Sequence, residues 1–268
     1  MIKFQNVSKT FGDQVMALNE VSFEVPKGQL CVLLGHSGAA KSTLLQMVNG
    51  LLEPSQGAVF VDGFEVNART VKDIQRKVAM IHQEFNLASR SSVAVNVMAG
   101  ALGNVPLWMA LIGWFPKEIR KKCCTLVDRV GLDEKHLKRR VRELSGGQQQ
   151  RVGIARSMML DPLILLADEP IASLDPSTSR EILSHLRRIA TESNCTILCS
   201  LHQVELAIEF SDRIIGIDSG TVVFDLLPTE VDEETLKLIY ANYELTDDNE
   251  IIERANVANM LDASTKPS

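Results

Sequence analysis

Gly35-His36-Ser37-Gly38-Ala39-Ala40-Lys41-Ser42-Thr43 joins an apolar, strand-like segment at residues 30–34 to a helix-like run at residues 44–48. A loop of small residues between a buried strand and a helix N-terminus binds phosphate through backbone N–H groups and the helix dipole. In the pattern G-x-x-x-x-G-K-[ST], the lysine reaches the outer phosphates and the hydroxyl reaches Mg²⁺. The stretch therefore predicts an α/β fold organised around a phosphate-binding loop.

Length and composition limit the class of protein. The 268 residues suggest one large domain or a core with a substantial insertion, and 45% hydrophobic residues are enough for a buried core. The net charge of −6 argues against strong attraction to nucleic acid or anionic lipid. The five cysteines have no metal-ligand spacing: Cys31, Cys195 and Cys199 in apolar runs are typical of reduced core residues of a cytosolic protein, and we expect Cys123 and Cys124 to be structural thiols.

We expect that the chain does not enter a membrane by itself. The N-terminus does not have the shape of a signal peptide. The longest apolar stretch, Val105 to Phe115, is well short of the ~20 residues needed to span a bilayer.

The hydrophobic pattern predicts an α/β core with an insertion. Apolar runs and period-two alternation predict strands at 2–7, 18–25, 30–34, 58–61, 78–81, 163–167, 196–201, 213–217 and 222–227. From about residue 86 to residue 155 the pattern is helical, with helices expected at 92–102 and 117–130. Beyond residue 229 the composition turns acidic, and we expect a short helix near 232–242 followed by a poorly ordered tail. The predicted domains are therefore 1–228 and 229–268.

Polar residues stand just past the ends of three predicted strands: Gln83, then Asp168 and Glu169, then His202. Open parallel sheets bind ligands at this edge, and two adjacent carboxylates at a buried strand end repel each other unless a cation is near. Gln83 or His202 alone is more often an ordinary loop residue, and the pair of carboxylates alone leaves both interpretations open, but their joint occurrence makes chance implausible. Residues 144–151 form a small-residue turn that leads into a helix, which is a second candidate anion site.

In this order, the stretches resemble the nucleotide-binding subunit of ATP-binding-cassette (ABC) transporters over roughly residues 1–228. The matches are Walker A at 35–43, the Q-loop at Gln83, the LSGGQ signature at 144–148, Walker B at 163–168, the D-loop at 173–175 and the switch histidine at His202. The signature is the most specific match, since other P-loop ATPases lack it. The resemblance implies a P-loop NTPase (RecA-like) core with an antiparallel β-subdomain and an inserted helical subdomain, as in the ABC nucleotide-binding domain.

A finer resemblance is to the ATPases of phosphonate importers, a subfamily that also includes phosphite importers. It rests on residues 103–108, 113–115 and 172–176. It implies an ATP-hydrolysing subunit that powers phosphonate or phosphite uptake. The alternative is that Trp108 and Trp114 are ordinary packing residues of a longer insertion.

The family resemblance also implies roles for individual residues. Catalytic roles fall to Glu169, as general base for the attacking water, with His202 and Gln83. Mg²⁺ would be held by Ser42 and Gln83, with Asp168 in its outer shell or bound through water. ATP would contact Phe11 through adenine, and otherwise Gly35, His36, Ser37, Gly38, Ala39, Ala40, Lys41, Ser42, Thr43, Ser145, Gly146, Gly147, Gln148 and Asp175.

The implied assembly contains more than one chain. In the family, the signature binds the γ-phosphate held by the other subunit, so two copies enclose two ATP molecules head to tail. The resemblance implies a homodimer beneath two permease subunits, peripheral on the cytoplasmic face of the cell (inner) membrane. A periplasmic or extracellular solute-binding protein would act indirectly, and nucleic acid is not an expected partner.

Ala40 departs from the family pattern, which has glycine directly before the lysine. If Ala40 has a positive φ, its Cβ costs roughly 1–2 kcal/mol. If this cost arises only in the ATP-bound state, it weakens the affinity for ATP ~10-fold. The alternatives are a working ATPase, a slow or weakly binding one, or a regulatory subunit without turnover. A soluble cassette of DNA repair or translation is less favoured, because the chain has neither sustained heptads nor a second set of motifs.

Overall fold

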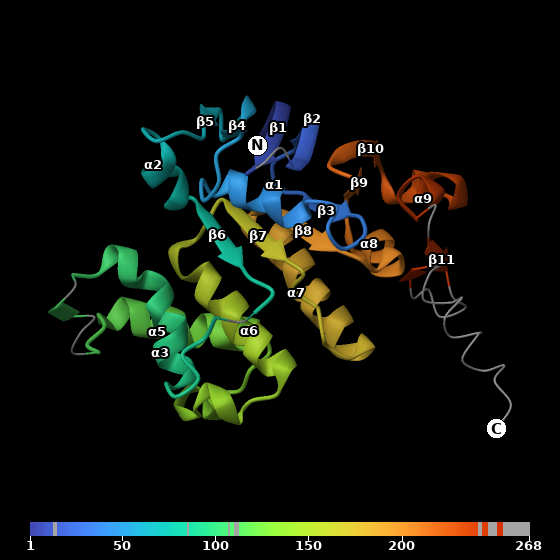
Figure 1. Ribbon diagram of the computed structural model, residues 1–268. Helices are drawn as coiled ribbons and strands as arrows, with labels where there is room; N and C mark the ends of the chain where they lie inside the picture. The colour runs from blue at the N-terminus through green and yellow to red at the C-terminus, as the bar shows by residue number, and fades with distance from the viewer. Residues whose placement is uncertain are drawn as a thin grey trace, which may run out of the picture.

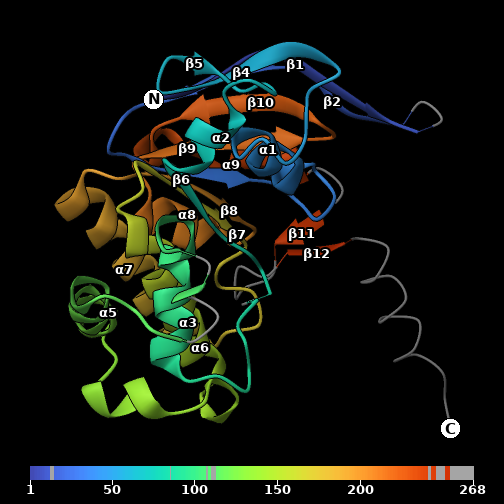
Figure 2. The same ribbon diagram turned by 90° about the vertical axis from the view of Figure 1, so that its left-hand side faces the viewer.

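The computed structural model describes residues 1–12, 15–84, 86–106, 108–109, 113–240, 243–245 and 251–253. Two sheets form its framework (Figures 1 and 2). The four-stranded sheet is antiparallel, in the order β2 (Val15–Val25), β1 (Ile2–Phe11), β4 (Gln56–Val61) and β5 (Phe64–Glu65). Burial along β2 alternates from Val21 to Val25, as the period-two pattern predicts.

The six-stranded sheet carries the predicted loop and most of the predicted polar residues. Its order is β10 (Thr221–Leu226), β9 (Arg213–Asp218), β3 (Leu30–Leu34), β8 (Thr196–Leu201), β7 (Ile164–Asp168) and β6 (Val78–Ile81). All neighbouring pairs are parallel except β10 with β9. Every residue of β3 and β8 is buried, because both faces of a central parallel strand are covered.

Two hydrophobic cores lie on the two faces of this sheet. Cys31 and Leu33 of β3 belong to the core shared with the four-stranded sheet and with α1 (Lys41–Val48). Leu30, Val32 and Leu34 point the other way, into the core shared with α7 (Pro176–Ser193) and α8 (Val204–Phe210). The helix α1 is thereby held between the two sheets (Figure 1). The short helix α2 (Val71–Gln75) precedes β6.

The predicted insertion is helical, and it lies at the end of the molecule away from the four-stranded sheet (Figure 2). Its elements are α3 (Val93–Met98), η1 (Ala99–Asn104), α5 (Lys117–Arg129), η2 (Glu134–Lys138), η3 (Val141–Glu143), α6 (Gly146–Ser157) and η4 (Met158–Leu160). The predicted helix 92–102 divides into α3 and the 3₁₀ turn η1. Gly100 of η1 passes so close to Arg156 that an added Cβ would lie 2.1 Å from its carbonyl oxygen.

The chain ends in the short elements η5 (Pro228–Glu230), α9 (Glu233–Tyr240), β11 (Tyr243–Leu245) and β12 (Ile251–Glu253). Leu236, Ile239 and Tyr240 of α9 are buried in the core that also contains α7 and α8. The predicted tail includes the antiparallel pair β11 and β12, and the rest of it lies outside the described residues. The division at residues 228 and 229 stays a prediction.

Among the described residues, no helix combines the length and the apolar character needed to cross a membrane. Four cysteines are buried and Cys124 is exposed. Burial raises the pKa of the Cys123 and Cys195 thiols to about 12, so these side chains stay protonated and pack as small apolar groups. Leu107, Ala110, Leu111 and Ile112 of the apolar stretch 105–115 lie outside the described residues.

Candidate active site

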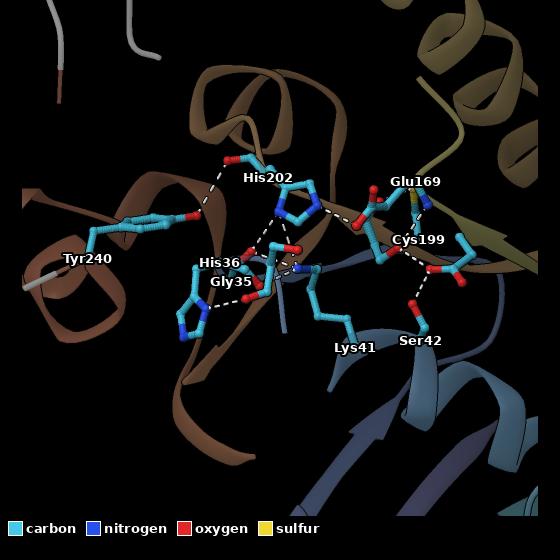
Figure 3. Close-up of polar contacts among 11 residues, drawn as sticks. Gly35, His36, Lys41, Ser42, Glu169, Cys199, His202 and Tyr240 are labelled. Atoms are coloured by element: carbon cyan, nitrogen blue, oxygen red, sulfur yellow. Dashed lines mark hydrogen bonds and ion pairs between the residues drawn. The ribbon is translucent and has the colours of Figure 1, made fainter. Parts of the chain in front are cut away.

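The phosphate-binding loop follows β3, and its lysine begins α1. The Lys41 side chain is buried, and its Nζ donates to the carbonyl oxygens of Gly35 at 2.7 Å and His36 at 2.9 Å (Figure 3). Burial lowers the pKa of Lys41 from 10.5 to about 8, while Glu169 and Asp168 oppose that shift. A buried ammonium held by two carbonyls is poised to exchange them for an anion.

Ala40 has φ 71° and ψ 21°, in the left-handed region, so the sign that the sequence left open is positive. Its carbonyl accepts the first hydrogen bond of α1, from Leu44 N at 3.2 Å. Its methyl group packs against the core beneath the four-stranded sheet. The start of α1 therefore fixes this backbone conformation.

Asp168 ends β7, where it accepts two hydrogen bonds on one oxygen. Ser42 Oγ and Ser200 Oγ each donate to Asp168 Oδ1 at 2.9 Å. Ser200 Oγ also accepts from Glu169 N at 2.9 Å, so it bridges the two acidic residues. Sequence reasoning missed Ser200. The available signal was a single hydroxyl in the otherwise apolar buried run 197–201, but its partner is set by the register Asp168↔Ser200.

His202 joins the loop to the acidic pair. Its Nδ1 lies 3.0 Å from Gly35 O, and its Nε2 is hydrogen-bonded to Glu169 Oε1 (Figure 3). Tyr240 at the end of α9 donates its hydroxyl to the His202 carbonyl at 3.4 Å. Glu169 itself has φ 46°, an uncommon conformation for a non-glycine residue. The ends of β3, β7 and β8 thus bring a cation, two carboxylates and an imidazole together.

His36 fixes the loop from its other side. Its Nε2 lies 3.0 Å from Asp218 Oδ1, and its Nδ1 lies 2.6 Å from Ser37 O. Asp218 ends β9, next to β3 in the sheet. Like Ser200, Asp218 contacts a residue of the site although the sequence analysis did not single it out. Among the other residues of the phosphate-binding loop, Ser37 and Gly38 are exposed, Ala39 is buried and Thr43 is half-buried.

Several predicted site residues lie outside this cluster. Phe11, at the end of β1, is 41% exposed, with Lys9 Nζ 5.2 Å from its ring centroid. Gln83 is exposed two residues beyond β6, at the same edge of the sheet as Asp168. Asp175 caps α7, accepting from Thr178 N at 3.0 Å and Ser177 Oγ at 2.6 Å, and these bonds hold its pKa well below the usual range.

The signature residues begin α6 in the helical subdomain. Ser145 and Gln148 form a capping box, in which Ser145 Oγ accepts from Gln148 N and Gln148 Oε1 accepts from Ser145 N. Gly146 is the first residue of α6. Gly147 packs so tightly on α7 that a Cβ would lie 2.3 Å from Thr178 Cγ2.

The oxygen donors of the site fit a hard divalent cation. Ser42 Oγ and Asp168 Oδ1 are 2.9 Å apart and face each other across the end of β7. Mg²⁺ is commonly held by one or two protein oxygens together with substrate phosphates and water. The donor set therefore matches Mg²⁺ better than a metal that needs sulfur or nitrogen ligands.

Comparison with known proteins identifies the family. The model of the ABC transporter family matches residues 18–172. The chain belongs to the ABC transporter family. Its fold is that of the ABC nucleotide-binding cassette, as predicted, and the chain is an ATPase of this family.

The relatives and structural neighbours agree. A phosphonates import ATP-binding protein of Hydrogenovibrio crunogenus is 47% identical over 90% of this chain and 88% of its own length. The corresponding protein of Thiobacillus denitrificans is 44% identical over 93% and 96%. A dimeric post-hydrolysis structure of the ATP-binding cassette MJ0796, bound to ADP and phosphate, has a TM-score of 0.72 and 31% identity over 85% of this chain and 99% of its own. These relatives do not favour a soluble cassette of DNA repair or translation.

Proposed function

We propose that this chain hydrolyses Mg-ATP to power an importer of phosphonate or phosphite. The named activity of the relatives, phosphonates import, supports the solute class. The chain would act as a homodimer on two permease subunits, at the cytoplasmic face of the cell membrane, with a solute-binding protein outside. The solute would contact those partners rather than this chain.

The observation that carries the proposal is the connection from Gly35 through His202 to Glu169, beside the Ser42–Asp168 pair. Phosphoryl transfer needs mainly positioning and charge stabilisation. Main-chain N–H groups of residues 37–43 bind the β-phosphate, and Lys41 exchanges its carbonyl partners for phosphate oxygens. Glu169 takes the proton of the attacking water.

His202 acts on that base rather than on the proton itself. By holding Glu169 Oε1 on one side and Gly35 O on the other, it fixes the carboxylate relative to the loop. Ser42 and Asp168, with Gln83, would hold Mg²⁺, which neutralises charge on the phosphate oxygens. Ser200 orients both acidic residues through one hydroxyl.

The signature would serve the second copy. Ser145 and Gly147 begin α6 in the helical subdomain, whereas Lys41 begins α1 between the sheets (Figure 1). A helix N-terminus of this kind attracts phosphate. A head-to-tail dimer would place it opposite the partner's loop, and the dimeric cassettes among the structural neighbours support a dimer of this chain.

The test is phosphate release by the purified protein with Mg-ATP, comparing Glu169→Gln with a matched control. Glu118→Gln removes a carboxylate on the exposed surface of α5. We expect Glu169→Gln to abolish phosphate release and to accumulate ATP-bound dimers in gel filtration, while Glu118→Gln behaves as the wild type. Equal phosphate release by all three proteins would refute the role of Glu169 and favour a regulatory subunit.

The solute is tested in the assembled transporter. In proteoliposomes with permease and binding protein, phosphonate or phosphite should stimulate phosphate release and other oxyanions, such as sulfate, should not. Stimulation by sulfate alone would refute the proposed solute while leaving the ATPase assignment intact.

A further inference from the structure

The charge of the chain is strongly segregated. Residues 86–155 contain 12 Lys and Arg against 5 Asp and Glu, although the whole chain has 28 against 34. The helical subdomain is thus basic within an acidic protein. The net charge of −6 hides this asymmetry.

Four arginines form one group within this charge, and we call them the basic cluster: Arg90, Arg139, Arg140 and Arg142. A turn that contains Arg90 and the segment 139–142 that leads into η3 carry them side by side. Val141 N donates to Ser91 O at 3.0 Å, Arg142 N donates to Ser89 O at 3.0 Å, and Ser92 and Arg140 form an antiparallel bridge. The cluster therefore belongs to a fixed surface, although its residues lie about fifty positions apart in the sequence.

All four side chains are exposed. Within the part of the chain that the structure describes, none of them has a carboxylate partner, whereas Arg129 and Arg151 of the same subdomain pair with Glu192 and Glu181. Four like charges kept together and unpaired repel one another. An external anion would relieve that repulsion.

The surroundings of the cluster favour a lipid surface as the source of that anion. Arginine binds phosphate oxygens with two parallel N–H donors. Val95, one turn into α3 from the bridge, is 43% exposed, and Trp108 and Trp114 in the same subdomain are 58% and 52% exposed. Exposed tryptophan and basic residues are both typical of protein surfaces at membrane interfaces. The two segments lie at the extremity opposite the four-stranded sheet (Figure 2), where a broad surface can approach.

We propose that the basic cluster binds the anionic phospholipid headgroups of the membrane beside the permease. The inference rests on the proposed function only in assuming that the chain works at a membrane. The two segments lie between Gln83 and the signature, so lipid contact would hold the helical subdomain at a fixed height while the two copies close. The binding itself does not require ATP.

The test is co-sedimentation of the full-length chain with vesicles of phosphatidylcholine alone or mixed with phosphatidylglycerol. We expect binding only to the mixed vesicles. It should weaken from about 0.05 M to about 0.5 M salt, because the screening length shortens. Replacing all four arginines by glutamine should reduce partitioning by about 600-fold, since each basic residue near an anionic surface contributes about five-fold (about 1 kcal/mol).

A charge-matched control carries Lys27→Gln, Arg69→Gln, Lys72→Gln and Lys237→Gln, four exposed residues outside the helical subdomain. It should bind the mixed vesicles as the wild type does. Equal binding by the cluster variant and the wild type, or no binding by either, would overturn the proposal. So would a cluster variant that loses only permease binding, because the cluster would then be a protein contact.

Phosphate release, measured on the same preparations, separates this inference from the proposed function. If the wild-type protein releases phosphate normally but does not bind the mixed vesicles, the lipid site alone is overturned. Vesicle binding by a wild-type protein that releases no phosphate overturns the ATPase role alone.

Discussion

Replacing Ala40 by glycine tests whether the backbone strain at this position is present in the free protein or arises only when ATP binds. At φ 71° the Cβ of Ala40 costs roughly 1–2 kcal/mol, and glycine removes that cost. Two effects oppose the gain. Glycine makes the unfolded chain more flexible, by about 0.4–1 kcal/mol. It also loses the packing of a half-buried methyl group, about 0.5 kcal/mol. The net change in the free energy of unfolding should therefore be within about 1 kcal/mol of zero.

The effect on ATP should also be small. The hydrogen bond from Leu44 to Ala40 and the packing of α1 fix the left-handed conformation, so folding carries its cost in both free and bound protein. We expect Ala40→Gly to change the KM for ATP less than about 3-fold, because a strain difference near zero gives no differential binding. The assays are urea unfolding and phosphate release at varied Mg-ATP.

The neighbouring residue supplies the matched control. Ala39 is fully buried and is not among the positive-φ residues, so Ala39→Gly should destabilise the fold by about 1 kcal/mol. A KM that falls 10-fold or more in Ala40→Gly, with unchanged stability, would refute the reasoning. The strain would then arise only on nucleotide binding.

Three further predictions follow from the site. Lys41 has its pKa lowered to about 8 and bound phosphate favours its charged form, so ATP affinity, measured by calorimetry, should be flat below about pH 7 and fall up to about 10-fold per unit above pH 8. An unchanged affinity at pH 9 would contradict this. Ser200→Ala leaves the Glu169 N–H unbonded, so thermal unfolding should show a loss of about 1–3 kcal/mol, and phosphate release should fall about 10-fold; normal turnover would exclude a positioning role for Ser200. Gly147→Ala should be destabilising because its Cβ would meet Thr178 Cγ2 at 2.3 Å. The same change in a Thr178→Ser background should be neutral or stabilising, since alanine is the better helix former, and persistent destabilisation would locate the cause elsewhere.

The lowered pKa of Lys41 also makes the free energy of unfolding depend on pH. The unfolded chain binds the Lys41 proton more tightly than the folded chain does, because burial disfavours the ammonium. The contribution of Lys41 to the free energy of unfolding therefore rises as the pH increases from about 8 to 10.5 and is constant below that window.

Much of the architecture could be predicted because local patterns report local structure. The largely apolar runs at 30–34, 163–167 and 196–201 occupy three adjacent central strands, and the period-two segment 18–25 lies in the antiparallel sheet. The capping residue Ser92 marks the start of α3, but the close approach of Gly100 to Arg156 that accompanies the change to η1 could not be read from the sequence.

The sequence by itself determined the chemistry of the site: a small-residue loop with Lys41 and Ser42, and acidic and imidazole side chains at the ends of parallel strands. Only the tertiary structure decided the sign of φ at Ala40, the bridging role of Ser200 and the pairing of residues 89–92 with residues 140–142. The physical reason is that the residue types in a motif state which groups are available. Register and packing between segments far apart in the chain decide which groups touch, and at what cost.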